Sequence, residues 1–308
     1  MSSADDLDQG RLRDLGVDAE LIAQRLGLDG DYALALLAEL PVLAAYWQGR
    51  LGLRNGRIMP GGVLSAVLRC ERVEDGTTVF LKLSGEHEHS AGAEAAALAA
   101  WDGAGACALR WTGDDGRVML LDAIQPGAAV APGDDRVDAG RAGDLLRTLH
   151  RIRANRIPPA IPPAALELNW RFERAHRMLD GPSHARGLVS HAEIDAARRA
   201  ALALDEQSVT RVMCHGDFID KNILLDGDGA WWAIDPRPCV ADPCLDAGFW
   251  ALTHRPGMFV RDRCSLTARA ICADPERVWA WAQAFAVSEA VLVTDLDRAR
   301  AHHSVLSG

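Results

Sequence analysis

The sequence lacks long apolar runs. No stretch of its 308 residues approaches the roughly 18 uninterrupted apolar residues that a membrane-spanning helix requires. The first residues, MSSADDLDQG, are acidic and lack the basic-then-apolar order of a secretory signal peptide. Disorder is excluded for most of the chain, because 49% of its residues are hydrophobic and only 25% are charged. We therefore expect a globular, cytoplasmic protein without a membrane partner.

Lysine is also scarce, and acidic residues outnumber basic ones. The formal net charge is −10, which argues against a protein that binds nucleic acid by neutralising phosphates. Lysine occurs only at Lys82 and Lys221. A position that keeps lysine in such a sequence can be one that needs a compact ammonium group, although genome composition alone can produce the same bias. We expect no nucleic-acid partner, and the oligomeric state, monomer or dimer, stays open.

The cysteines lack the spacing of a metal site or a disulfide framework. The chain has 7 cysteines, an odd number, and no Cys-x-x-Cys pair. Zinc-binding modules and disulfide-stapled domains are therefore poor explanations of this sequence. We expect reduced thiols, most of them buried as small apolar side chains.

The distribution of apolar residues predicts two regions of different architecture. The first contains two helices within residues 17–50, then a β-hairpin, one alanine-rich helix and two short strands. Residues 125–134 are rich in proline and glycine and mark a boundary. Beyond them the pattern is mainly helical, with one β interruption at about 211–235. The sequence therefore predicts an α+β fold with domains at 1–124 and 125–308.

Hydrophobic periodicity and turn residues also give approximate bounds for the elements. Strands are expected at 63–68, 77–84, 107–111 and 117–122. Helices are expected at 90–101, 136–153, 166–180, 191–205, 243–253 and 276–300. This order describes a small antiparallel β-sheet lobe with one helix, followed by a larger and mainly helical lobe.

The strongest functional signal is the segment VMCHGDFIDKNILL at residues 212–225. An apolar strand leads into His-Gly-Asp, Asn222 follows five residues after Asp217, and a second apolar strand begins at once. Asp235 ends the next strand, thirteen residues after Asn222. We therefore expect these three side chains at one edge of a small β structure.

This set of side chains is the one that phosphoryl transfer requires. A carboxylate such as Asp217 can accept the proton of an attacking hydroxyl, and oxygens of Asn222 and Asp235 are hard ligands suited to Mg²⁺. Oxygen ligands suffice because the chemistry depends mainly on positioning and charge neutralisation. His215 is expected to orient the backbone of the loop, and direct proton transfer by this residue is the less favoured alternative.

At these residues the chain resembles the aminoglycoside phosphotransferase family, which has a bilobal, protein-kinase-like fold. HGDFIDKN is similar to the family's His-Gly-Asp-x-x-x-x-Asn loop, AIDP at 233–236 takes the place of its metal-binding Asp segment, and LDAGFW at 245–250 looks like its structural Asp. LPVLAAYW at 40–47 and MLLDAIQPG at 119–127 are similar to the branch of streptomycin 6-phosphotransferases and hydroxyurea phosphotransferases. The resemblance covers about residues 35–290.

The resemblance implies ATP, with GTP as the alternative, and Mg²⁺ as cofactors. Lys82 lies in a predicted strand and can pair with Glu94 on the following helix, which is how the family holds the α- and β-phosphates. The alternative is an edge-strand lysine that keeps the sheet soluble. Ser65 is a weaker candidate for phosphate contact, and Asp122 and Ile124 occupy the place of the family's adenine-binding hinge.

The sequence departs from the family in two places. MPGG at 59–62 is not a Gly-x-Gly-x-x-Gly phosphate loop and is also typical of an ordinary turn. Where this chain has Phe-Ile-Asp-Lys in the catalytic loop, the branch usually has Leu-His-His-Gly, which leaves the acceptor open. Asp220 and Asp242 are candidate carboxylates for binding a cationic acceptor. Their alternative role is a loop cap or an ion pair with Lys221 or Arg237.

The sequence thus predicts an ATP- and Mg²⁺-dependent O-phosphotransferase that acts on a small hydroxylated molecule, in particular an aminoglycoside or aminocyclitol of streptomycin type. A kinase for a sugar, an amino alcohol or a hydroxyurea-like compound is the alternative among enzymes. A protein kinase is disfavoured, because only ten residues separate Asp235 from Asp246 and leave no long activation segment. A catalytically silent nucleotide-binding protein would be expected to lack one of the catalytic or phosphate-binding side chains, and the chain retains all of them.

Overall fold

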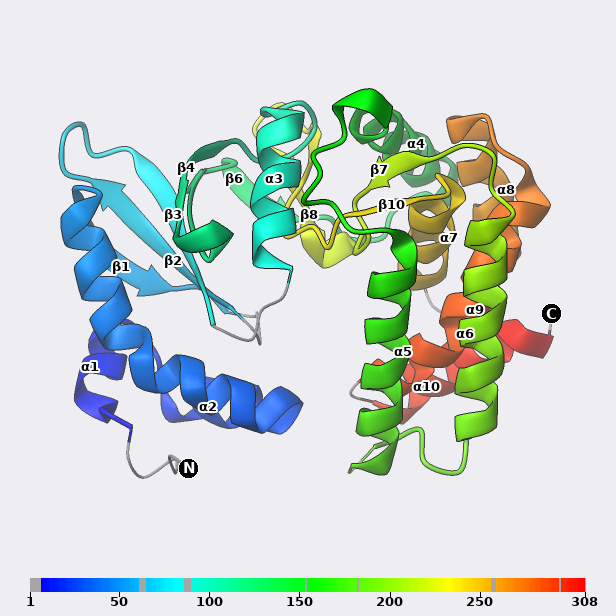
Figure 1. Cartoon of the computed structure of the whole chain (residues 1–308), viewed down its shortest axis with the longest axis horizontal. Helices are drawn as coiled ribbons and strands as arrows, with labels where there is room; N and C mark the ends of the chain where they lie inside the picture. Colours follow the sequence, from blue (N-terminus) through cyan, green and yellow to red (C-terminus); the bar gives the residue numbers. More distant parts are fainter. Residues whose placement is uncertain are drawn as a thin grey trace. The chain divides into compact units, whose positions relative to one another are not determined.

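The computed structural model describes residues 7–60, 65–85, 90–152, 154–181, 183–255, 259–293 and 295–307 (Figure 1). The chain divides into two compact units. The first comprises Met1–Gly103 and Cys107–Ala123, and the second comprises Ala104–Ala106 and Ile124–Gly308. Among the described residues, no helix is both long enough and apolar enough to cross a membrane.

Helices occur in both units, and most of them belong to the second. The helices of the first unit are α1 (Gln9–Asp14), α2 (Ala19–Arg50), α3 (Ala91–Trp101) and the 3₁₀ turn η2 (Asp114–Gly116). Those of the second unit are α4 (Asp135–Leu149), α5 (Ala164–Asp180), α6 (His191–Glu206), α7 (Cys244–Thr253), α8 (Val260–Ile271), α9 (Pro275–Leu292) and α10 (Leu296–His303), with 3₁₀ turns η3 (Ala154–Arg156), η4 (Asp220–Asn222) and η5 (Ser304–Ser307).

The strands form one larger sheet in the first unit and two small sheets in the second. The larger sheet contains β1 (Leu53–Ile58), β2 (Ser65–Arg72), β3 (Thr78–Ser84), β5 (Val118–Asp122) and β4 (Leu109–Gly113), in that spatial order. The small sheets contain β6 (Pro126–Ala129), β8 (Ile223–Asp226) and β9 (Trp231–Ala233), and β7 (Val212–Cys214) with β10 (Cys239–Ala241). All of these pairings are antiparallel, so the predicted α+β class is confirmed.

The core of the first unit lies on one face of its five-stranded sheet. Side chains alternate along β3, so Val79, Leu81 and Leu83 enter the apolar core, where they meet leucines of α2. Lys82 lies between two of these residues in β3, and its side chain therefore leaves the sheet on the opposite face. The predicted β2–β3 hairpin is confirmed, and it closes with Gly76 in the left-handed conformation at φ +73°.

The N-terminal helices differ from the prediction. We expected two helices within 17–50, whereas the structure has the single helix α2, which runs through Gly30 and Pro41. Proline removes one backbone hydrogen bond but can remain inside a helix that bends. The ribbon of α2 changes direction along its length (Figure 1). The helix does not end at Gly30. Packing of its later turns against the sheet stabilises the long helix.

The centre of the second unit is formed by α7 and α9. Every residue of α7 from Cys244 to Leu252 is buried, and α9 stacks Trp281 on Phe285 with ring centroids 5.6 Å apart. Helices that are apolar on all sides must be covered on all sides. α9 accordingly contacts α5, α6, α7, α8 and α10. The buried position of α7 matters for function, because this helix carries Asp246.

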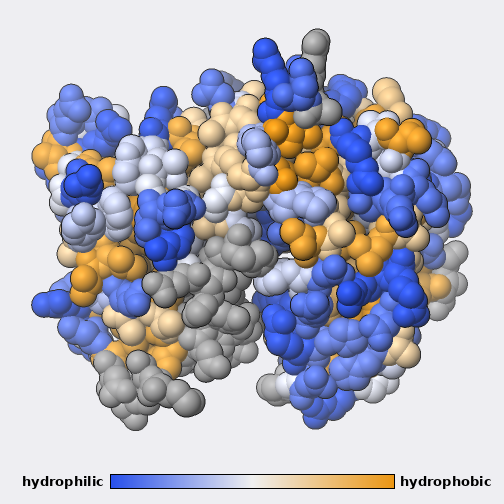
Figure 2. Space-filling model, in the orientation of Figure 1, coloured by the Kyte–Doolittle hydropathy of each residue, from blue (hydrophilic) through white to orange (hydrophobic). Residues whose placement is uncertain are grey.

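α5 and α6 are amphipathic and cover this core. α5 buries Leu168, Phe172, Ala175 and Leu179, a spacing of three and four residues that places them on one face. α6 begins at a capping box formed by Ser190 and Glu193. The outward faces of these two helices are mostly hydrophilic (Figure 2).

Several elements were not predicted. They are α1, β1, β6, β10 and α8, and the expected helix 276–300 is divided into α9 and α10. β1 contains Asn55 and Gly56, which disfavour strands, and Asn55 is left-handed at φ 57° where the β1–β2 register shifts. Pairing with β2 overrides the weak local propensity. The break between α9 and α10 coincides with a new N-cap, since the Asp295 side chain accepts a hydrogen bond from the amide of Arg298.

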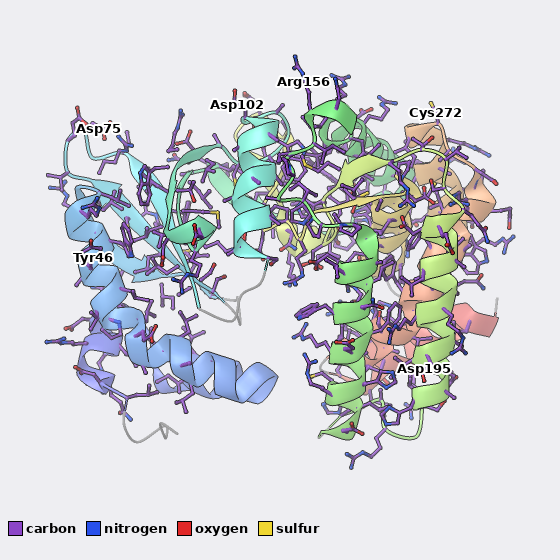
Figure 3. The ribbon with its side chains drawn as sticks, viewed as in Figure 1. Tyr46, Asp75, Asp102, Arg156, Asp195 and Cys272 are labelled. Carbon is purple, nitrogen blue, oxygen red and sulfur yellow. The ribbon has the colours of Figure 1, made fainter. Side chains whose placement is uncertain are left out.

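The cysteines are free, and all except Cys272 are buried, which confirms the prediction of mostly buried thiols. Burial raises the pKa of Cys70 to about 11 and that of Cys264 to about 12. These two thiols therefore stay protonated and unreactive near neutral pH. Cys272 follows α8 and lies at the surface (Figure 3).

His302 on α10 makes the stability of the second unit sensitive to acid. Its ring is buried, and burial lowers its pKa from 6.5 to about 4. Between these pH values the unfolded chain binds more protons than the folded chain, so the free energy of unfolding falls as the pH is lowered. The full effect amounts to about 3 kcal/mol. In urea unfolding, His302→Leu should reduce the change of the unfolding free energy with pH. The control His184→Leu, at an exposed position, should not. The same dependence on pH in both variants would contradict the assignment to His302.

Candidate active site

The candidate site is built on the loop at residues 215–222, called the catalytic loop below, which joins β7 to β8. β7 pairs with β10 and places Cys214 opposite Cys239. The amide of Arg237 donates to the carbonyl of His215 at 2.8 Å. The start of the catalytic loop is therefore fixed against the segment that follows Asp235.

Asp246 on α7 anchors the backbone of the catalytic loop. Its side chain is fully buried, and its carboxylate accepts hydrogen bonds from the amides of His215 at 2.7 Å and Gly216 at 2.8 Å. His150, after the end of α4, approaches the same carboxylate with Nε2 at 2.9 Å. Burial by itself would raise the pKa of Asp246, but the bonds and positive potential of these partners lower it. The carboxylate thus remains charged inside the core and holds the loop backbone.

His215 connects the catalytic loop to the next hairpin. Its Nε2 donates to the carbonyl of Ile234 at 3.0 Å, and its Nδ1 accepts from the amide of Asp217 at 3.3 Å. This pattern needs one ring proton, on Nε2. Burial also lowers the pKa of His215, so the ring is neutral. The expectation that His215 orients backbone is consistent with this geometry.

Asp217 and Asn222 are brought together by the turn of the catalytic loop. Nδ2 of Asn222 donates to the backbone carbonyl of Asp217 at 2.9 Å and to its Oδ2 at 2.8 Å. Since both contacts use the amide nitrogen, the amide oxygen of Asn222 faces elsewhere. The Asp217 side chain is 16% exposed. The arrangement leaves a partly accessible carboxylate of fixed orientation.

Asp235 lies at the same end of the β8–β9 hairpin as Asn222. β8 begins directly after Asn222, β9 ends at Ala233, and Ile223 is paired with Ala233. The amide of Ile234 donates to the carbonyl of Asn222 at 2.9 Å. Asp235 has φ 55°, a conformation that an L-residue rarely adopts. Such strain persists only where the surroundings enforce it, and it is frequent at functional sites.

Arg171 on α5 is a neighbour of Asp217 that the sequence did not reveal. Its Nη2 lies 3.4 Å from Oδ1 of Asp217, and its Nη1 lies 2.8 Å from Oε1 of Glu289 on α9. The guanidinium also stacks on Phe249 at 4.3 Å. Burial raises the pKa of Glu289, against the effect of Arg171. No spacing rule connects these helices in sequence, so only the fold reveals the cluster.

A small cavity adjoins this cluster within the second unit. It is lined by Glu167, Leu168, Trp170, Arg171, Gly216, Arg237, Cys239, Leu245 and Phe285. Nη2 of Arg237 lies 3.3 Å from Oε2 of Glu167, and its guanidinium stacks on Trp170 at 3.9 Å. Carboxylates and guanidinium groups are therefore paired around the cavity.

Lys82 and Glu94 form a buried ion pair in the first unit. Nζ of Lys82 lies 2.7 Å and 2.6 Å from the two carboxylate oxygens of Glu94, and both residues are buried. Lys82 sits opposite Val67 on β2 and Met119 on β5. It is thus in an inner strand of the sheet, and the alternative of an edge-strand lysine does not apply.

The remaining nucleotide-site candidates have different surroundings. Ser65 starts β2 opposite Ser84 and is 8% exposed. The carboxylate of Asp122 pairs with Arg110, with Nε of the arginine at 2.7 Å. Ile124 is half-buried. A nucleotide contact of these three residues stays a prediction. The turn at Gly61-Gly62 and the histidines at 87 and 89 lie outside the described residues.

The prediction that Asp242 binds an acceptor is wrong. Asp242 is buried, with 1% of its surface exposed. Its Oδ2 accepts from Nε of Arg277 at 2.5 Å and from Nε1 of Trp281 at 2.9 Å, while Oδ1 accepts from the amide of Cys244. A carboxylate with these bonds has no face left for a ligand. Asp242 instead fixes the start of α7 against α9.

Asp220 keeps a partly accessible carboxylate, but it is not alone. The side chain is 19% exposed, and both oxygens contact Nδ1 of His254 at 2.8 and 2.9 Å. The partner in the structure is this histidine, whereas the alternative that we expected was a loop cap or an ion pair with Lys221 or Arg237. An ionised carboxylate can accept further hydrogen bonds, so a role in acceptor binding stays a prediction.

Gly216 has a conformation and surroundings that only glycine fits. Its φ is +77°, and a Cβ atom there would lie 1.9 Å from the carbonyl oxygen of Arg237. Gly229 has a similar φ of +78° but no atom within 4 Å of such a Cβ. Gly229→Ala should cost only about 1 kcal/mol of stability from backbone strain. Gly216→Ala should cost more than about 3 kcal/mol, because the loop must also move. Urea unfolding of the two variants makes the comparison, and equal losses would show that the catalytic loop is loosely held.

Comparison with known proteins agrees with this geometry. Residues 53–296 match the model of the aminoglycoside/hydroxyurea antibiotic resistance kinase family. The chain is 32% identical over 275 residues to hydroxyurea phosphotransferase of Kitasatospora aureofaciens, covering 86% of this chain and 76% of that protein. It is 30% identical over 266 residues to streptomycin 6-kinase of Streptomyces griseus, covering 82% of each chain.

The fold is also shared with more distant kinases. A crystal structure of choline kinase from Streptococcus pneumoniae superposes with a TM-score of 0.60 at 12% identity, covering 87% of this chain and 98% of that one. This likeness confirms the predicted kinase-like fold. The family match, which spans the catalytic loop and the hairpin that carries Asp235, and the two curated relatives establish that the chain belongs to the aminoglycoside/hydroxyurea antibiotic resistance kinase family and is a phosphotransferase.

Proposed function

We propose that the protein transfers the γ-phosphoryl group of ATP, with Mg²⁺, to a hydroxyl group of a small molecule of aminoglycoside or aminocyclitol type. One observation carries the proposal. The catalytic loop fixes the Asp217 carboxylate through Asn222, and the adjoining hairpin brings Asn222 and Asp235 to its same end. GTP is the alternative nucleotide.

Asp217 has the surroundings of a general base. Its Oδ2 is held by Asn222, and the carboxylate keeps an accessible fraction. In phosphoryl transfer the attacking hydroxyl loses its proton as the new P–O bond forms, and an oriented carboxylate accepts that proton. The buried carboxylate of Asp246 holds the backbone amide next to Asp217 and limits its movement during this step.

Asn222 and Asp235 fit the requirements of a magnesium site. Mg²⁺ prefers hard oxygen ligands, and the amide oxygen of Asn222 points away from Asp217 because the amide nitrogen is committed to it. Asp235 supplies a carboxylate at the same end of the hairpin. When bound, the ion neutralises charge on the phosphates during transfer.

The first unit supplies the phosphate-binding lysine. Lys82 is oriented by both oxygens of Glu94 and is 4% exposed, so its ammonium group has a fixed position. We infer that it binds the α- and β-phosphates, with Ser65 as an additional contact and residues 122–124 near the base. Burying a lysine–carboxylate pair costs desolvation energy. A functional role or further hydrogen bonds would explain why such a pair is kept.

The charge around the catalytic loop favours a second candidate acceptor. Glu167 is paired with Arg237, Glu289 with Arg171, and Asp220 with His254. An ammonium group of an aminoglycoside would have to share these carboxylates with their present partners, while Asp220 retains exposed acceptor capacity. A small uncharged hydroxylated acceptor of hydroxyurea type needs no such carboxylate, and it is the alternative.

Asp217→Asn tests the base. The substitution should lower kcat by about 10²- to 10⁴-fold and leave nucleotide binding nearly unchanged, since it removes proton acceptance but not phosphate contacts. Turnover is measured as ADP release with streptomycin and with hydroxyurea as acceptors. Nucleotide affinity is measured by calorimetry. Asp228→Asn, at an exposed position of the β8–β9 turn, is the matched control. Unchanged turnover in Asp217→Asn would remove this residue from the proposed role.

Asp235→Ala tests the metal ligand. Its carboxylate is proposed to act through the ion, so the variant should weaken binding of Mg·ATP much more than binding of ATP in the presence of a chelator. Calorimetric titration with and without Mg²⁺ separates the two effects. Equal weakening under both conditions would mean that Asp235 contacts the nucleotide directly or supports the fold. Unfolding curves for the variant provide the control for stability.

A further inference from the structure

His254 bridges the catalytic loop to a helix that is remote in sequence. It follows the last residue of α7, and its side chain is completely buried. Nδ1 lies 2.8 and 2.9 Å from the carboxylate oxygens of Asp220 in the catalytic loop. Nε2 lies 3.1 Å from Oδ2 of Asp138 on α4. The ring therefore contacts a carboxylate at each of its two nitrogens.

Hydrogen-bonding chemistry determines how many protons this ring carries. An ionised carboxylate only accepts hydrogen bonds, so each ring nitrogen needs a proton of its own. A neutral ring would direct one lone pair at a carboxylate oxygen. Oδ2 of Asp138 also accepts from the amide of Gly133 at 2.6 Å, as an ionised carboxylate oxygen does. This arrangement favours an imidazolium.

The charged groups near His254 are compatible with a positive ring. On α4, Asp135 lies 3.3 Å from Nη1 of Arg263 on α8 and 3.3 Å from Nη1 of Arg255. Asp138 and the catalytic-loop residue Asp220 are the other two carboxylates of the cluster. Two guanidinium groups face these three carboxylates. An imidazolium at His254 would make the numbers of positive and negative charges in this set equal.

The aromatic neighbour of the ring also favours the charged form. Trp250, one turn earlier on α7, stacks on His254 with ring centroids 4.5 Å apart and an angle of 28°. The face of an indole ring attracts a cation. Two independent features therefore favour a positive ring: the carboxylates that surround it and this stacking.

We propose that His254 is a positioning residue whose doubly protonated ring fixes the catalytic loop to α4 and thereby orients Asn222 and Asp217 for phosphoryl transfer. The proposal rests on the proposed function. Asp220 is the first residue of η4 and Asn222 is the last, and Asn222 donates to Asp217 at 2.8 Å. A change at His254 is thus transmitted to the base through a single 3₁₀ turn.

The protonation state is tested first, in a measurement that needs no acceptor. In the full-length protein with ¹⁵N-labelled histidine rings, the signals that disappear in His254→Asn should have the chemical shifts of two protonated nitrogens at neutral pH. Deuterium exchange of amides 219–222 should accelerate in the same variant. A ring with one unprotonated nitrogen, or unchanged exchange, would overturn the proposal.

The kinetic test separates positioning from general stability. His254→Asn retains a donor near Asp220 but carries no charge, and it should lower kcat by about 10- to 100-fold, because small displacements of reacting groups are costly. The KM for ATP should change little. His303→Asn is the control, since His303 lies 3.2 Å from the single carboxylate Glu193 far along the chain from the loop. A loss confined to KM, or a wild-type kcat, would overturn the positioning role.

A second variant keeps the test valid if His254→Asn does not fold. Asp138→Asn leaves the histidine in place but removes its charged partner on α4, so it should lower kcat in the same direction and accelerate exchange of amides 219–222. A wild-type kcat together with unchanged exchange in this variant would overturn the bridge. If the wild type shows the doubly protonated ring but transfers phosphate to no acceptor, the proposed function fails and the charged bridge stands.

Discussion

The candidate active site depends on one buried carboxylate. Asp246 is completely enclosed, yet its oxygens accept from two consecutive backbone amides of the catalytic loop and meet the ring of His150. An uncompensated buried carboxylate would cost several kcal/mol, at least about 3 by the measured effect of breaking buried pairs. The catalytic loop and α7 are thus obligatory partners: neither can move without exposing an unpaired charge or unpaired amides. Because α7 is buried along most of its length, the whole core of the second unit serves as the support of this loop.

Short hydrogen bonds connect Asp246 to the side chains of Asn222 and Asp217. His215 is held by Asp246 at its amide and reaches the β8–β9 hairpin through the carbonyl of Ile234. Asn222, at the start of that hairpin, holds Asp217. The links from Asp246 to His215 and from His215 to Ile234 join a side chain to backbone, and the link from Asn222 to Asp217 joins two short side chains, so few rotatable bonds are involved. Such a network fixes angles as well as distances, which matters for a reaction whose catalysis is mainly positioning.

Charges in both units occur in pairs or balanced groups. Lys82 with Glu94 and Arg171 with Glu289 each join one cation to one carboxylate, while the cluster around His254 balances three carboxylates. Burial makes an unpaired charge expensive, so each group is matched within its own neighbourhood. Because these charges are already paired, long-range electrostatic attraction can contribute little to the binding energy of a charged acceptor. Recognition of a cationic acceptor would depend on partly exposed groups such as Asp220, whereas a neutral acceptor would depend on hydrogen bonds and shape.

The sequence by itself determined the family, the α+β class, most element positions and the pairing of Lys82 with Glu94, because these follow from local periodicity and from motifs within short stretches of chain. It also indicated Asp217, Asn222 and Asp235, whose mutual spacing is preserved by a loop and one hairpin. It failed where distant segments decide. Asp242 looked accessible between two site residues, but α9 brings Arg277 and Trp281 onto it. Arg171, Glu289 and His254 had no local signature, since their partners lie 34 to 118 residues away. Electrostatic pairing acts through space, and only the tertiary structure decides which charges meet.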